Sequence, residues 1–202
     1  MKKKLFSILI CGLLILGTVG CGSKKETSKS ESENKSSSEE KSSSEEKSNK
    51  VESKGNCDVF ECIEKADTKS TYEQMNELIG FEGTMLREGN GWKTYEWKLN
   101  DEDSVEATFY SSSTTISIKF NNDRIKNDKV DFSKFNEVKT ALNNRESVSY
   151  DALKEKFGGV DGTMTEKSSS GYTYKWVNSQ GGYMNASLNK DKTRCSMIMG
   201  RA

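Results

Sequence analysis

Apolar and polar residues alternate along the chain between positions 92 and 120, which is the pattern of strands with one buried face. The apolar positions are Tyr95, Trp97, Val105, Ala107, Phe109, Ile116, Ile118 and Phe120. The polar positions between them include Thr94, Glu96, Glu106, Thr108, Thr115, Ser117 and Lys119. Gly, Asn, Asp and Ser cluster at 88–91, 100–104 and 111–113, where turns are expected. The pattern predicts four antiparallel strands with one face open to solvent.

Two helices are predicted ahead of these strands. The first is a short segment over 59–66. The second has apolar residues at helical spacing, namely Tyr72, Met75 and Ile79. Ser70 and Glu73 have the spacing of a capping box at its start, and Gly80 is typical of a helix end in the left-handed conformation. One unit is therefore expected to run helix, helix, four strands.

The same unit occurs a second time. GTMLREGNGWKTYEW at 83–97 and GTMTEKSSSGYTYKW at 162–176 begin and end alike, with an offset of 79 residues. Farther along, the same offset matches Val105, Ala107, Phe109, Ile116, Ile118 and Phe120 with Met184, Ala186, Leu188, Cys195, Met197 and Met199. Upstream, TYEQMNELIG matches SYDALKEKFG once a one-residue insertion near Gly158-Gly159 is allowed. The chain is a tandem duplication of a unit of about 75 residues.

The second unit predicts the same elements as the first. One helix is expected over 132–142, and the next has Tyr150, Leu153 and Phe157 on one face before Gly158. The expected fold is α+β: two tandem repeats, 57–123 and 124–202, each with two helices followed by a four-stranded antiparallel sheet. The helices cover one face of the sheets, and the other face is open and concave. Wide rings at core-facing positions are expected to pack against the helices; they are Tyr95, Trp97, Tyr174 and Trp176.

The N-terminus has the pattern of an export signal. Three lysines precede a sixteen-residue apolar run from Leu5 to Gly20, which is short for a membrane span. Thr18-Val19-Gly20-Cys21 resembles the bacterial lipoprotein signal, in which the cysteine receives a diacylglyceryl group. We therefore expect a signal peptide over 1–20 and lipidation at Cys21, which would hold the protein at the extracellular face of the cell membrane.

A polar segment follows the predicted lipidation site. Residues 24–54 contain eight lysines, eight glutamates and eleven serines, and Val51 is their one apolar residue. Such a segment cannot bury enough apolar surface to fold. We expect 21–56 to be a lipid anchor and a disordered tether that spans roughly 30 Å on average.

The composition of the remaining 148 residues excludes several functions. They carry 20 basic and 23 acidic side chains, so a nucleic-acid partner is not expected. The whole chain has no histidine, which excludes histidine triads and histidine-ligated zinc. No nucleophile with an adjacent base is evident. We expect no enzyme, no cofactor and no metal.

Three cysteines belong to the predicted folded part, namely Cys57, Cys62 and Cys195. A bridge between Cys57 and Cys62 would leave Cys195 over, whereas a metal site would need a second cysteine pair that the sequence lacks. We expect neither a catalytic nor a metal role for them. The acidic residues at 100–103 lack the glycine and final glutamate of a calcium loop, so a solvated turn is expected there. Residues 121–131 are expected to be an exposed connector.

The tandem helix-helix-strand units, with a glycine-ended second helix followed by G-T-x and T-Y-x-W, resemble the β-lactamase inhibitor protein and related small lipoproteins of Gram-positive bacteria. The resemblance covers 57–202. It implies two four-stranded sheets side by side, with helices behind them and a concave face that clasps a partner protein. In the inhibitor, that contact face is rich in aromatic residues.

Few aromatic residues are expected on the open face of this chain. Its positions in the first unit are Thr94, Glu96, Lys98, Glu106, Thr108, Tyr110, Thr115, Ser117 and Lys119. In the second unit they are Thr173, Lys175, Val177, Tyr183, Asn185, Ser187, Arg194, Ser196 and Ile198. Binding hot spots favour Trp, Tyr and Arg. The candidate partner-binding residues are therefore Trp92, Tyr110, Tyr183 and Arg194.

Together these features lead to one functional expectation and one alternative. The expected protein is a membrane-anchored extracellular lipoprotein that acts as a non-catalytic binding module for a protein or cell-wall partner. An inhibitor-like role is one form that this binding could take, but the small number of aromatic residues on the open face argues against inhibition of β-lactamase. The alternative is a structural or envelope-assembly lipoprotein without inhibitory activity, which rests on analogy of fold alone.

Overall fold

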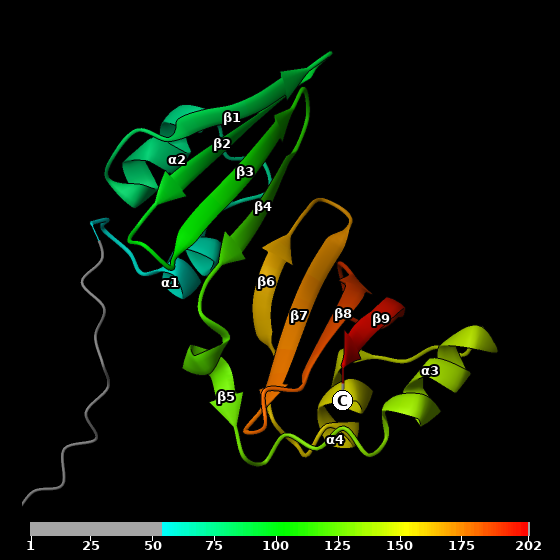
Figure 1. Ribbon diagram of the computed structural model, residues 1–202. Coiled ribbons are helices and arrows are strands. Elements are labelled where there is room, and N and C mark those ends of the chain that lie inside the picture. The colour runs from blue at the N-terminus through cyan, green and yellow to red at the C-terminus, as the bar shows by residue number, and fades with distance from the viewer. Residues whose placement is uncertain (1–53, 202) are drawn as a thin grey trace, which may run out of the picture. The chain divides into compact units, whose positions relative to one another are not determined.

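The computed structural model describes residues 54–201, which belong to one compact unit (Figure 1). The predicted signal peptide, Cys21 and most of the predicted tether lie outside the described residues. None of the helices in the described part has the length and apolarity that a membrane span requires.

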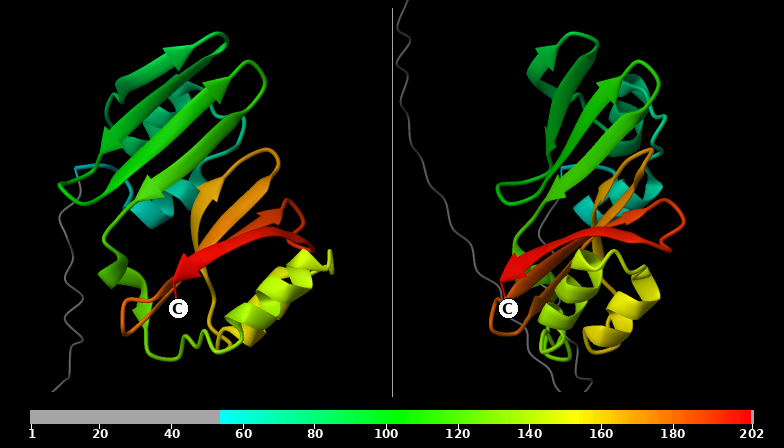
Figure 2. Two further views of the ribbon diagram at one scale, coloured as in Figure 1. Left: turned by 45° about the vertical axis from the view of Figure 1, so that its right-hand side comes forward. Right: turned by 90° about the vertical axis from the view of Figure 1, so that its right-hand side faces the viewer.

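The predicted α+β repeat architecture is confirmed (Figures 1 and 2). The first repeat comprises α1 (Val59–Lys65), α2 (Tyr72–Ile79), β1 (Thr84–Gly89), β2 (Trp92–Lys98), β3 (Ser104–Tyr110) and β4 (Thr114–Lys119). The second comprises α3 (Phe135–Asn143), α4 (Tyr150–Lys156), β6 (Thr163–Lys167), β7 (Gly171–Asn178), β8 (Tyr183–Asn189) and β9 (Cys195–Arg201). A 3-10 helix, η1 (Asn122–Ile125), and a two-residue strand, β5 (Lys126–Asn127), join them.

The eight main strands form one continuous antiparallel sheet, in the order β1-β2-β3-β4-β6-β7-β8-β9. The junction between the repeats is short, because only Ile116 with Lys167 and Ser117 with Glu166 pair across β4 and β6. Helix α1 reinforces it: the Lys167 ammonium group donates hydrogen bonds to the carbonyl oxygens of Ala66 (2.6 Å) and Glu64 (3.2 Å) at the end of that helix. Met164 packs against the apolar clusters of both repeats.

The start of α2 differs by one residue from the prediction. Thr71, not Ser70, is the N-cap, and its capping-box partner is Gln74 rather than Glu73. The helix ends as expected at Gly80, whose φ of +97° lies in the left-handed region. Helix α3 begins at Phe135, three residues later than predicted, whereas Phe132 is buried against Phe157 with ring centroids 5.6 Å apart.

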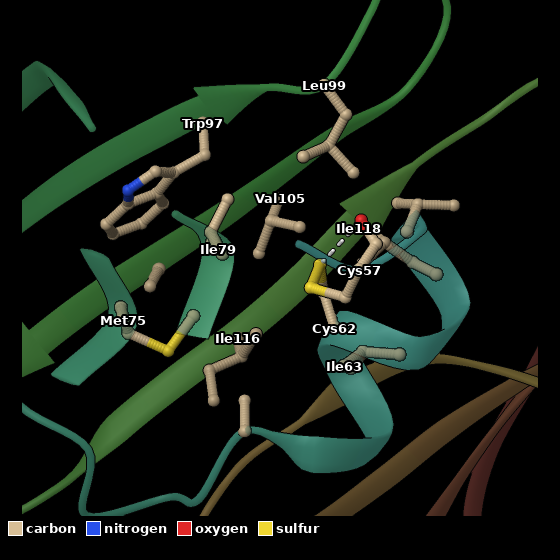
Figure 3. Packing of buried hydrophobic residues seen from close by; sticks show 13 residues of the cluster. Cys57, Cys62, Ile63, Met75, Ile79, Trp97, Leu99, Val105, Ile116 and Ile118 are labelled. Carbon is tan, nitrogen blue, oxygen red and sulfur yellow. Dashed lines mark hydrogen bonds between the residues drawn. A yellow bond between two sulfur atoms is a disulfide. The ribbon is translucent and has the colours of Figure 1, made fainter. Parts of the chain in front are cut away.

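Each repeat has its own apolar cluster between sheet and helices. In the first, Met75 and Ile79 of α2 and Cys62 and Ile63 of α1 pack against Trp97 and its neighbours on the strands (Figure 3). Cys57 and Cys62 form a disulfide within this cluster. In the second repeat, Val138, Leu153 and Phe157 pack around Trp176, and Cys195 is buried with a free thiol.

The two Thr-Tyr-x-Trp motifs occupy matching surroundings. Trp97 and Trp176 are almost fully buried, at 0% and 1% exposure. Each indole N–H donates to a backbone carbonyl oxygen before the first strand of its repeat, at 3.1 Å to Phe81 and 2.9 Å to Val160. Each also lies near a tyrosine of the second helix, with ring centroids 5.9 Å and 6.0 Å apart. The prediction that these rings are core residues is confirmed.

The turn at 100–103 and the connector at 121–131 contain exposed residues, as predicted, but an ion pair that was not predicted joins them. Asp103 is buried, receives hydrogen bonds from Asn100, and forms a short ion pair with Arg124 of η1. Its second carboxylate oxygen, Oδ1, has no hydrogen-bond partner among residues 54–201. The Arg124 guanidinium also lies 4.7 Å from the centre of the Phe60 ring. The connector is therefore fastened to the first repeat, and β5 pairs with β7 of the second.

Candidate binding face

The sheet face opposite the helices carries charged residues that are paired within the first repeat. Arg87 lies 2.8 Å from Glu106 in an ion pair. The carboxylate of Glu96 accepts a hydrogen bond from the Ser104 hydroxyl at 3.1 Å and lies 3.7 Å from Lys119. Each of these charges has a partner of opposite sign two strands away, since Arg87 on β1 reaches Glu106 on β3 and Lys119 on β4 reaches Glu96 on β2. The first repeat consequently presents a self-neutralised surface.

The matching positions of the second repeat carry different charges. With the offset of 79 residues, Arg87 corresponds to Glu166, Glu96 to Lys175 and Glu106 to Asn185. The carboxylate of Glu166 makes no hydrogen bond or ion pair within the described part of the chain. Surrounding protein atoms displace water from it and raise its pKa above the usual value.

Lys175 is half-buried on the same face. Its ammonium group donates to the Asn122 side-chain oxygen at 2.7 Å and lies 5.3 Å from the ring centre of Tyr183. Desolvation lowers the pKa of Lys175, because burial disfavours the charged form. The ammonium has no carboxylate partner among residues 54–201, so it remains available to an anionic group of a ligand.

Strand β9 presents methionines to this face, contrary to prediction. Met197 and Met199 were expected in the core, and Ile198 on the open face; instead, the two methionines are 46% and 54% exposed, and Ile198 packs against the second cluster. The reason is a bulge at Ser196, because Ser187 pairs with Met197 whereas Leu188 pairs with Cys195. One extra residue exchanges the two faces of the strand that follows it.

The bulge also changes which residues of β4 and β9 correspond. Ala107 pairs with Ile116, and its copy Ala186 pairs with Ile198, so Ile198 occupies the position of Ile116. By the same pairing, Met197 and Met199 replace Thr115 and Ser117. The match of Ile116 with Cys195 that the constant offset suggested is therefore wrong. Two hydroxyl-bearing positions of the first repeat have become large apolar ones in the second.

These side chains surround a groove of about 520 Å³, which we name the repeat 2 groove. It is lined by Ser117, Ile118, Lys119, Phe120, Thr165, Glu166, Thr173, Lys175, Asn185, Ser187, Met197 and Met199. Thr173 and Ser187 are linked by a hydrogen bond of 3.2 Å between their hydroxyls. The groove combines the Glu166 carboxylate, which has no partner among residues 54–201, with the ammonium groups of Lys175 and Lys119, several hydroxyls and two exposed thioethers.

The four predicted contact residues do not form one surface. Trp92 and Tyr110 pair across β2 and β3, and the Trp92 ring lies over Gly89 of β1, so they form a patch in the first repeat. Tyr183 stands beside Lys175, next to the repeat 2 groove. Arg194 precedes β9 and, together with Arg145, lines a neighbouring hollow of about 500 Å³ that shares Glu166 with the repeat 2 groove. The structure thus brings together two of the four.

Two positions predicted to face solvent are closed off, namely Thr94, which is 0% exposed, and Val177. Val177 is 1% exposed, although it shares a face of β7 with Lys175. It pairs with Lys126 of β5 on one side and with Tyr183 on the other. The connector that was expected to be exposed therefore borders this end of the sheet and shields Val177.

Residues other than the predicted ones dominate the groove. Glu166, Lys175, Met197 and Met199 were not among the predicted contacts, since aromatic and arginine side chains were given preference. For Glu166 and Lys175, a signal was present, because the duplication reverses the charge at both positions. For the methionines no comparable signal exists, because the bulge that exposes them depends on strand pairing.

No group of three or more Cys, Asp and Glu residues that could hold a metal ion occurs within 54–201. Burial raises the pKa of the Cys195 thiol, which opposes formation of a nucleophilic thiolate. No protein-family model matches the chain, and no curated protein or solved structure matches it either.

Proposed function

We propose that this protein is a non-catalytic binding module, held at the outer face of the cell membrane by a lipid on Cys21, and that the repeat 2 groove is its contact with a partner protein. The observation that carries the proposal is the contrast between the two copies of the open face. Charges are paired in the first repeat. In the second, the carboxylate of Glu166 has no partner among residues 54–201, and two methionines are exposed.

A protein partner fits this groove better than a small molecule does. Small-molecule sites are usually enclosed cavities or deep clefts. The repeat 2 groove lies instead on an open sheet. Methionine is enriched at protein interfaces, and its flexible thioether adapts to a partner's apolar side chains. The unpaired carboxylate and the two ammonium groups would fix the orientation of the partner through complementary charges.

The proposed location is supported by the cysteines. The disulfide between Cys57 and Cys62 lies in the first apolar cluster. Disulfides of this kind persist in oxidising compartments and are rare in the cytosol. The predicted export signal and lipidation motif at Thr18-Val19-Gly20-Cys21 favour the same compartment.

The groove can be tested by cross-linking on intact cells that produce the full chain. A photoreactive amino acid at Met197 should link to one protein species, whereas the same group at Lys98, on the open face of the first repeat, should not. After the partner is identified, Glu166→Lys and Lys175→Glu should each raise Kd about tenfold or more, because each places a charge of the wrong sign in the contact.

The matched control is Glu102→Lys, an exposed charge change in the first repeat. It should leave binding unchanged. Cross-linking at Lys98 but not at Met197 would refute the proposed contact. Binding to purified peptidoglycan without any cross-linked protein would point instead to a cell-wall partner, and an envelope defect on deletion without any bound ligand would favour the structural alternative.

Inhibition of β-lactamase is the specific activity that the resemblance suggests. The repeat 2 groove has a single aromatic lining residue, Phe120, so we expect no inhibition by the purified protein. An inhibition assay measures this directly. Inhibition that survives Glu166→Lys but is lost with Trp92→Ala would place the contact on the first repeat.

A further inference from the structure

The two strands that form the junction between the repeats, β4 and β6, each have a copy in the other repeat, and these copies lie at the two edges of the sheet. At the junction, β6 pairs with the outer edge of β4. Strand β1 is the copy of β6, and both strands have a bulge at the same place, between Met85 and Arg87 and between Met164 and Glu166. Strand β9 is the copy of β4. In the order of the sheet, β1 and β9 are its two edge strands.

Both edges are open within the described part of the chain. Every residue of β1 is exposed, including Met85 at 49% and Leu86 at 45%. Strand β9 is covered at its start, where the Cys195 N–H donates to the Val148 carbonyl oxygen at 2.7 Å. Beyond that bond, its backbone bonds with β8 and with no other described element. Neither strand contains proline or lysine, and the unpaired backbone groups of an open edge form a site where another strand can add.

The junction indicates what such a strand would contact. Ile116 and Ser117 correspond to Ile198 and Met199 of β9, and Lys167 and Glu166 correspond to Glu88 and Arg87 of β1. Met164, which packs against both apolar clusters, corresponds to Met85. Met85 is 49% exposed, because no described strand pairs with the outer edge of β1 in the way that β4 pairs with β6.

Charge also fits this arrangement. At the junction, Lys167 donates to carbonyl oxygens at the end of α1. Its copy Glu88 is acidic and could not do so. The corresponding helix α3 is followed by Arg145, which is exposed and has a φ of +63°. In a pairing of two copies, an acidic residue of β1 would thus face a basic residue after α3. At the junction, a basic residue of β6 faces carbonyl oxygens at the end of α1, so the charges are exchanged but are again complementary.

From this correspondence we propose that the protein self-associates head to tail, with β1 of one copy pairing with β9 of the next. Ile198 and Met199 lie opposite Glu88 and Arg87 of the second copy, Met85 packs near α3, and Glu88 pairs with Arg145. Such an interface is heterologous, because it uses a different edge of each molecule. It does not close on itself in a dimer, so longer assemblies follow as concentration rises.

Sedimentation velocity of the full chain with Cys21→Ser, which prevents association through a lipid, tests this interface. The mean mass should rise steadily with concentration. Met85→Lys blocks the β1 edge, and Met199→Arg places an arginine opposite Arg87. Each variant alone should have a Kd for association about tenfold higher or more. Ser112→Lys, an exposed change in the turn after β3, is the control and should associate like the parent.

Mixing the two blocked variants gives the decisive result. Met85→Lys retains an intact β9 edge, and Met199→Arg retains an intact β1 edge, so the mixture should form a dimer of one copy each and nothing larger. Arg145→Glu should weaken association, and Glu88→Lys in the same chain should restore it. Circular dichroism checks that every variant is folded.

Other outcomes would overturn the proposal. A parent chain that stays monomeric at all concentrations contradicts it, and so does a mixture of blocked variants that remains monomeric. Continued association of Met85→Lys alone would indicate a symmetric pairing of two β9 edges instead. The groove contact is tested separately, because Glu166→Lys should leave self-association unchanged.

Discussion

The two repeats are alike in their cores and different on their open faces. Trp97 and Trp176 keep the same burial, the same carbonyl partner and the same tyrosine neighbour. On the open face, by contrast, Arg87 is replaced by Glu166 and Glu96 by Lys175. Core positions are constrained by close packing, since a change of even one methylene group is felt there. Surface positions are free of that constraint, so the second copy could acquire a different surface on the same scaffold.

The first way to challenge this comparison is to remove each tryptophan in turn. Trp97→Ala and Trp176→Ala should each lower the free energy of unfolding by about 3 to 5 kcal/mol, because each leaves a large cavity. Trp97→Ala should cost more, since its indole also donates to the Asn76 side chain at 2.9 Å. Urea denaturation followed by circular dichroism measures both. We expect one unfolding transition, because Met164 and the pairing of β4 with β6 connect the two apolar clusters. Separate transitions for the two repeats would contradict this coupling.

The second test concerns an ion pair that only the first repeat has. Arg124→Met leaves the buried carboxylate of Asp103 without its charged partner, and we expect a loss of about 3 kcal/mol in the free energy of unfolding. The position of Asp103 in the second repeat is Gly182, so no equivalent exists there. Lys126→Met removes an exposed pair with Asp123 and should cost under about 0.5 kcal/mol. Equal losses for the two variants would show that Asp103 is stabilised by other means.

The third test removes the disulfide, which also has no copy in the second repeat. Cys57→Ala with Cys62→Ala should lower the free energy of unfolding by about 2 kcal/mol, because the bridge closes only a short loop. Thermal unfolding with and without a reducing agent measures the difference. The reducing agent should affect the parent chain but not the double variant. A larger effect on the second repeat would mean that the clusters are more strongly coupled than the junction suggests.

The smallest expected effect is a change in alkaline stability at Tyr150. Its hydroxyl accepts a hydrogen bond from the Gly162 N–H and donates to Asp161, both at 3.1 Å. Burial raises the pKa of Tyr150 from 10.0 to about 12. The folded state therefore retains the proton longer than the unfolded state, so this contribution is complete below pH 10.0 and is lost as the pH rises toward about 12.

Tyr150→Phe removes that contribution. The difference in unfolding free energy between parent and variant should shrink between pH 10.0 and about 12, and it should be constant at lower pH. Urea denaturation at several pH values measures it. Subtracting the variant cancels the titration of lysines elsewhere. A difference that grows with pH would have the wrong sign for a tyrosine held in its protonated form.

Much of the fold was readable from local patterns. The period of two predicted β2, β3 and β4, the turn at 88–91 implied a strand before them, and the duplication extended these strands to the second repeat. The glycine after each second helix marked the end of that helix. The capping box was misplaced by one residue, since Ser70-Thr71 offers two neighbouring hydroxyls and only the backbone geometry selects Thr71. The site was harder to predict from the sequence. The preference of binding hot spots for aromatic residues pointed to Trp92 and Tyr110, whereas Glu166, Lys175 and the exposed methionines lie in the repeat 2 groove.

The sequence by itself determined the duplication, the order of the elements and the buried position of the paired tryptophans, because these depend on periodicity and on residues close together in the chain. Tertiary structure alone decided that the two sheets join through β4 and β6, that Arg124 neutralises Asp103, and that Met197 and Met199 face outward. Each of these depends on how distant strands pair. A single extra residue at Ser196 turns the rest of β9 over, and that residue is visible only once its partners on β8 are known.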